Sequence, residues 1–70
     1  MTQTNTNTPA RLLSRLERCE VNGSLAPDCR RVLRDERFAL AAACRSGDGA
    51  RIRSAVAEAI RVAEMWGVSL

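Results

Sequence analysis

The sequence lacks histidine, tyrosine and lysine, and it contains one phenylalanine and one tryptophan. Histidine is the residue that most often activates a cysteine or serine nucleophile, so the three cysteines have no base of the usual kind. Glu36 remains as a carboxylate base, but a single acid on a helix is more often the ion-pair partner of an arginine. We therefore predict that the protein is not an enzyme.

The sequence also shows no pattern typical of a metal site, and we expect no targeting segment. Cys19, Cys29 and Cys44 form no CxxC pair, and without histidine they do not make the usual tetrahedral zinc site. The first ten residues, MTQTNTNTPA, lack the basic and apolar segments of a signal peptide, and no apolar run reaches the ~18 residues of a membrane span. We expect a cytoplasmic protein with reduced cysteines, no metal, no cofactor and no membrane contact.

The length of 70 residues allows one domain with a small core. A chain of this size buries only about 60% of the surface of its unfolded state, and alanine supplies much of the apolar content here. We therefore expect self-association, most simply as a homodimer. Residues 1–7 are almost entirely threonine, asparagine and glutamine and are expected to be disordered, whereas residues 8–70 are expected to form one all-α domain.

Three segments have apolar residues at helical spacing, and short turns that contain glycine separate them. The predicted helices cover residues 9–20, 27–45 and 49–66. Pro9 is favoured at the first position of a helix, Asp48 is a good N-cap for the third helix, and Gly67 ends that helix. Because short connections make consecutive helices antiparallel, we predict a long hairpin of the second and third helices with a shorter N-terminal helix packed on it.

The longest predicted helix, residues 27–45, has two different faces. Its apolar stripe consists of Cys29, Val32, Leu33, Leu40 and Ala43, and its other side carries Arg30, Arg31, Arg34, Arg37 and Arg45. Glu36 falls inside the apolar stripe, where we expect it to need an arginine of another helix or of a second copy. Phe38 points out among the arginines, and Trp66 closes the apolar stripe of the third helix. The predicted core is Leu12, Leu13, Leu16, Val32, Leu33, Leu40, Ile52, Val56, Ile60 and Trp66.

The arginine side of the second helix is the strongest candidate for a binding surface. Arginine binds carboxylates and phosphates through planar, paired contacts, and arginine and aromatic residues dominate protein interfaces. We predict a small regulatory or adaptor protein that binds another protein through Arg30, Arg31, Arg34, Arg37, Phe38 and Arg45. A DNA- or RNA-binding regulator is the alternative, because the same arginines could neutralise phosphates while the ring stacks on a base. A GC-rich coding sequence would also favour arginine. Composition does not distinguish this coding effect from a surface that binds protein or nucleic acid.

Overall fold

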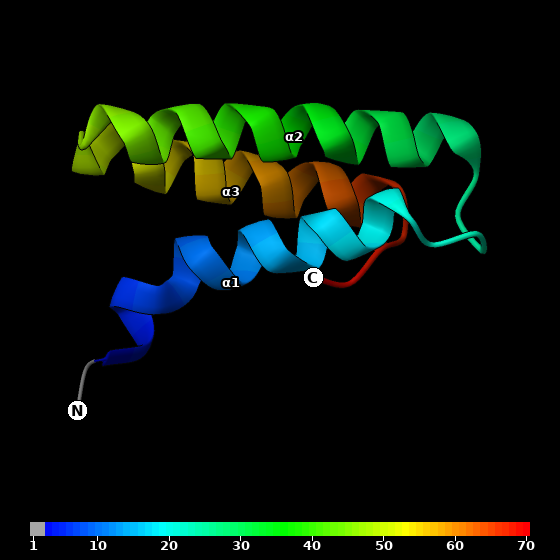
Figure 1. Ribbon diagram of the computed structural model, residues 1–70, viewed down its shortest axis with the longest axis horizontal. Coiled ribbons are helices and arrows are strands. Elements are labelled where there is room, and N and C mark those ends of the chain that lie inside the picture. Colours follow the sequence, from blue (N-terminus) through cyan, green and yellow to red (C-terminus); the bar gives the residue numbers. More distant parts are fainter. Residues whose placement is uncertain (1–2) are drawn as a thin grey trace.

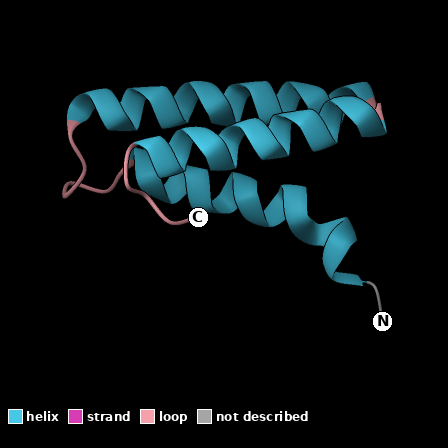
Figure 2. Ribbon diagram, turned by 180° about the vertical axis from the view of Figure 1, so that it is seen from behind, coloured by secondary structure: helices cyan, strands magenta, loops and turns pink. Residues whose placement is uncertain are grey.

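The protein is a unit of three antiparallel α-helices, which confirms the predicted all-α class (Figure 1). The computed structural model describes the backbone from residue 3 to residue 70 and the side chains from residue 8 on. Its helices are α1 (Gln3–Glu20), α2 (Pro27–Ser46) and α3 (Gly49–Met65). The described part of the chain contains helices, turns and loops but no strand (Figure 2). None of its helices has an apolar stretch long enough to cross a bilayer.

Helix α2 is the central element of the fold. Both α1 and α3 contact α2 extensively, whereas α1 and α3 scarcely touch each other. The largest fully buried side chains are Leu16 of α1 and Leu33 and Leu40 of α2, so the core lies on the side of α2 that the other helices cover. The buried apolar side chains are Leu12, Leu16, Cys19, Cys29, Leu33, Leu40, Ala43, Ala59, Val62 and Ala63. The predicted inner stripe of α2 is thus confirmed, with Val32 half-buried at its edge.

The first helix begins earlier than the sequence predicts. Pro9 lies inside α1, which starts at Gln3, and residues 3–7 continue the helix where a disordered segment was expected. Proline within a helix removes one backbone hydrogen bond and crowds the preceding turn. The first turns of α1 lead away from the other two helices (Figure 1). Met1 and Thr2 lie outside the described residues, so for them the expected disorder stays a prediction.

The other helix ends follow local sequence signals. A carboxylate oxygen of Asp48 accepts hydrogen bonds from the backbone N–H groups of Ala50 and Arg51, at 3.0 and 3.4 Å, which is the predicted N-cap of α3. Gly67 ends α3 in the left-handed conformation, with φ of 74°, and Val68 N–H then bonds the carbonyl of Ala63 at 2.8 Å. This turn reverses the chain, so that the last three residues return to the core (Figure 1).

Two of the predicted core residues lie largely at the surface. Trp66 is 43% exposed and Ile60 is 38% exposed, whereas Val62, which was not predicted, is buried. Helix α3 packs on α2 through its small residues Ala59 and Ala63. The buried side of α3 is therefore centred on these alanines, and Ile60 lies on the adjacent side. Because α1 does not cover that side, part of the predicted apolar stripe of α3 stays uncovered. The core prediction was therefore wrong for Trp66 and Ile60.

Candidate functional site

Four of the six predicted binding residues share one exposed face of α2. Arg31, Arg34, Phe38 and Arg45 are exposed, and their spacing of three, seven and fourteen residues places them along one line of the helix. Phe38 has 53% of its surface exposed, as the sequence predicted. We call these four residues the outer face of α2.

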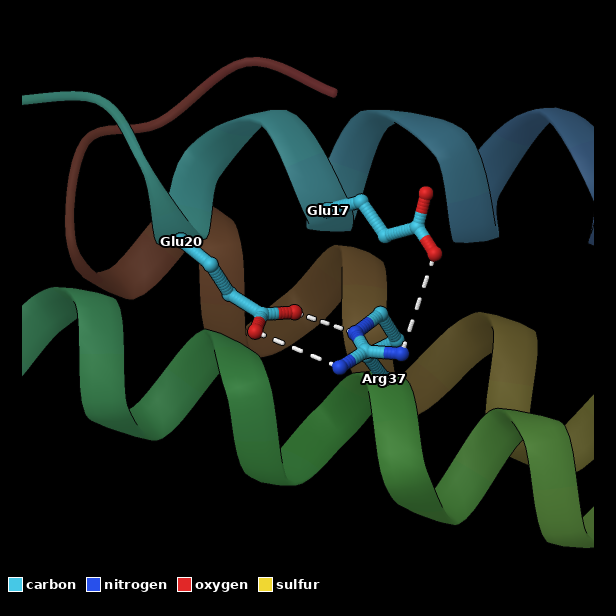
Figure 3. Close-up of polar contacts among 3 residues, drawn as sticks. All are labelled: Glu17, Glu20 and Arg37. Atoms are coloured by element: carbon cyan, nitrogen blue, oxygen red, sulfur yellow. Dashed lines mark hydrogen bonds and ion pairs between the residues drawn. The ribbon is translucent and has the colours of Figure 1, made fainter.

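The remaining two arginines, Arg30 and Arg37, are half-buried and form a separate row beside the outer face. Arg37 lies against α1 and contacts two of its acids (Figure 3). Its Nε donates to Oε2 of Glu20, its Nη2 donates to Oε1 of the same carboxylate at 3.2 Å, and its Nη1 lies 3.8 Å from a carboxylate oxygen of Glu17. The hydrogen bonds to Glu20 raise the pKa of the Arg37 guanidinium.

This arrangement corrects the position of Arg37. The helical periodicity predicts that Arg37 lies with the solvent-facing arginines, but its guanidinium joins the last turn of α1 to the middle of α2. Periodicity alone assigns Glu17 and Glu20 to no site. Their spacing of three residues at the end of the first helix, followed by a short connection, is the signal that could have placed them against α2.

Arg37 also supports the aromatic residue of the outer face. Its guanidinium carbon lies 4.9 Å from the centre of the Phe38 ring, within the range of a cation–π contact. Since Glu20 holds the other side of the guanidinium, the ring is attached to a group that is itself fixed between two helices. The Phe38 ring thus contacts a guanidinium that is bound to α1, while about half of the surface of Phe38 stays exposed.

A shallow hollow of about 410 Å³ lies at the first turns of α2, next to the outer face. It is lined by Glu20, Pro27, Arg30, Arg31 and Arg34. Arg31 pairs with Asp28 at 2.5 Å, but both side chains are well exposed, so this pair contributes little. The Nε of Arg30 is buried and donates to no acceptor among the described residues. Three arginines against one glutamate make this end of α2 a basic surface that suits a carboxylate or phosphate.

Glu36 lies on the opposite flank of α2, towards α3, and is half-buried as expected. Burial is the main cause that raises the pKa of its carboxyl group; Glu58 and Asp35 raise it further, and Arg61 lowers it. Arg61 is bound to Glu58 at 2.7 Å, and no ion pair joins Glu36 to an arginine among the side chains from residue 8 on. The expected buried arginine partner within the chain is therefore not found.

Two of the three cysteines lie in the core. Cys19 and Cys29 are buried, and Cys44 is half-buried. Burial raises the pKa of the Cys19 thiol, and Cys29 and Glu20 raise it further. No group of three or more cysteine or acidic side chains among the described residues could hold a metal ion. Trp66, expected to be a structural residue, follows α3 as its C-cap at the surface.

Comparison with protein-family models, with curated protein sequences and with solved structures finds no match to this chain. A functional assignment is therefore drawn from the surfaces that the chain itself presents.

Proposed function

We propose that the protein is a small, non-enzymatic regulatory or adaptor protein that binds another protein through the outer face of α2 and modulates it. The observation that carries this proposal is the placement of Phe38. The only phenylalanine of a chain with a small core is kept out of that core and lies 53% exposed in a line of arginines. Aromatic and arginine side chains supply most of the binding energy of protein interfaces.

The contact between Arg37 and Phe38 supports the same proposal. A ring that is already oriented loses less conformational entropy when a partner binds it. The basic hollow beside the ring adds Arg30, Arg31 and Arg34 to the surface that a partner would meet. A partner with an apolar pocket for the ring and acidic residues towards the start of α2 would match both features.

The test is a pull-down from the source cell with the tagged full chain and two variants. Phe38→Ala removes the exposed ring of the outer face, and Met65→Ala removes a 72% exposed apolar side chain of α3 as the matched control. Both variants should melt like the wild type, because surface truncations usually change stability by less than about 0.5 kcal/mol. We expect a protein partner that Met65→Ala retains and Phe38→Ala loses, with and without nuclease treatment.

Two outcomes would contradict the proposal. Loss of all binding after nuclease treatment, with affinity that falls steeply as salt is raised, would favour the nucleic-acid-binding regulator, since each neutralised phosphate adds to the salt dependence. Equal binding by wild type and Phe38→Ala would show that the ring takes no part in partner binding. We also propose that the protein forms a homodimer, because its core is small.

A further inference from the structure

A second surface lies between α1 and α3, away from the outer face of α2. Because these two helices scarcely touch each other, an open groove of about 580 Å³ remains along α3. Figure 2 shows the first turns of α1 diverging from α3 on this side. Its lining includes Pro9, Ile52, Arg53, Val56, Ala57 and Ile60, and we call it the α1–α3 groove.

The floor of the α1–α3 groove is apolar and belongs to one helix. Ile52, Val56 and Ile60 are spaced by four residues, so they form one row along α3. Ile52 and Val56 are half-buried, and Ile60 is 38% exposed. From Ile52 to Ile60 the row spans nine residues, or about 12 Å of helix, which is slightly more than two turns. This is the pattern by which a groove receives the apolar face of another helix.

The rim of the groove is basic. Arg53 lines the groove itself, and a smaller hollow of about 190 Å³ that shares Ile60 with it is lined by Arg11 and Arg15 of α1. No acidic residue lines either hollow. Glu64, four residues after Ile60, lines the next hollow and marks the end of the basic stretch. Glu58 lies between Val56 and Ile60 in the sequence, but it lines a different hollow, between α2 and α3.

We propose that the α1–α3 groove binds an amphipathic helix of a partner protein whose polar flanks are acidic. The row of Ile52, Val56 and Ile60 would bury the apolar face of that helix, and arginines of both α1 and α3 would face its acids. A second copy of this chain fits less well. A two-fold dimer through the same groove would place one basic rim against another, which costs energy.

Synthetic peptides of about 15–20 residues test this directly. The first is an acetylated, amidated helix with leucine on its apolar face and glutamate on both flanks, labelled with a fluorophore; the second has lysine in place of glutamate. The acidic peptide should bind the full chain, and the basic one should not. Ile60→Ser should weaken binding of the acidic peptide, and the thermal melt of this variant reports whether its fold is kept.

Charge-reversed variants separate a specific rim from general attraction to a basic protein. Arg53→Glu and Arg15→Glu should each weaken binding of the acidic peptide about 1.5-fold to 5-fold, as expected for exposed charge pairs. Their matched controls are Arg51→Glu on α3 and Arg18→Glu on α1, which change the net charge equally but line neither hollow. The double variant Arg15→Glu, Arg53→Glu should in turn bind the basic peptide. Phe38→Ala should leave peptide binding unchanged, because the outer face of α2 is a different surface.

Three results would overturn the proposal. The first is that the acidic peptide fails to bind the wild-type chain. The second is that Arg51→Glu weakens binding of the acidic peptide as much as Arg53→Glu does. The third is that the wild-type chain is a dimer that Ile60→Ser converts to a folded monomer. The last result would assign the groove to a second copy of the chain.

Discussion

Truncating Leu33 to alanine should remove a large part of the free energy of unfolding. Leu33 is 0% exposed and lies on α2, the helix that both other helices cover. Substitutions of fully buried leucine by alanine cost about 2–5 kcal/mol, because apolar contacts are lost and a cavity remains. A domain of 70 residues has a free energy of unfolding of about 3.5–10 kcal/mol, at roughly 0.05–0.15 kcal/mol per residue. One substitution is therefore expected to remove at least about a fifth of the total, and about half of it at the middle of both ranges.

The assay is thermal unfolding followed by far-UV circular dichroism at several protein concentrations. In a domain of this size a loss of 1 kcal/mol lowers the Tm by about 4–8 °C, so Leu33→Ala should melt at least about 10 °C below the wild type. Met65→Ala, which shortens an exposed side chain of α3, should melt within a few degrees of it. If the Tm fell equally in both variants, or if Leu33→Ala melted like the wild type, the central position of α2 in the core would be refuted.

Three further predictions concern the thiols, one carboxylate and the oligomeric state. In native protein a thiol reagent should label Cys44 faster than Cys19 and Cys29, which are buried, and all three should react quickly after denaturation. The raised pKa of Glu36 means that its neutral form is favoured in the folded state, so its contribution to stability is fully present at low pH and is lost as pH rises through the folded-state pKa. Glu36→Gln should accordingly be more stable than the wild type at neutral pH and lose this advantage on acidification; a variant that is less stable at neutral pH would instead indicate a cationic partner of Glu36, for example in a dimer. Sedimentation at micromolar concentration should give at least a dimer, and a monomer with a cooperative melt would contradict the expected self-association.

Local signals in the sequence predicted most of the secondary structure. The starts of α2 and α3 and the end of α3 follow Pro27, Asp48 and Gly67, residues that act within one turn of their own position. The start of α1 was missed because Pro9 is compatible both with a first helical position and with the interior of a helix that tolerates one lost hydrogen bond.

The candidate site was predictable only in part. Periodicity alone identified the outer face of α2, because the exposed side of a helix is the complement of its apolar stripe. It could not show that Arg37 turns towards Glu20 of α1, since this depends on how two helices pack. It also placed Trp66 and Ile60 in the core, because a stripe of apolar residues does not tell whether a neighbouring helix covers all of it. The α1–α3 groove follows from that same uncovered stripe.

The pattern of contacts around α2 also bears on how fast the chain folds. Extensive contacts form only between helices that follow each other in the sequence, whereas the pair from the two ends of the chain scarcely meets. Such local contacts need little loop closure, and helical proteins of this kind fold in microseconds to milliseconds. Either hairpin can therefore form first and serve as the template for the remaining helix. Because α1 and α3 each pack mainly on α2, we expect native-state hydrogen exchange to resolve the opening of α1 and the opening of α3 as separate events.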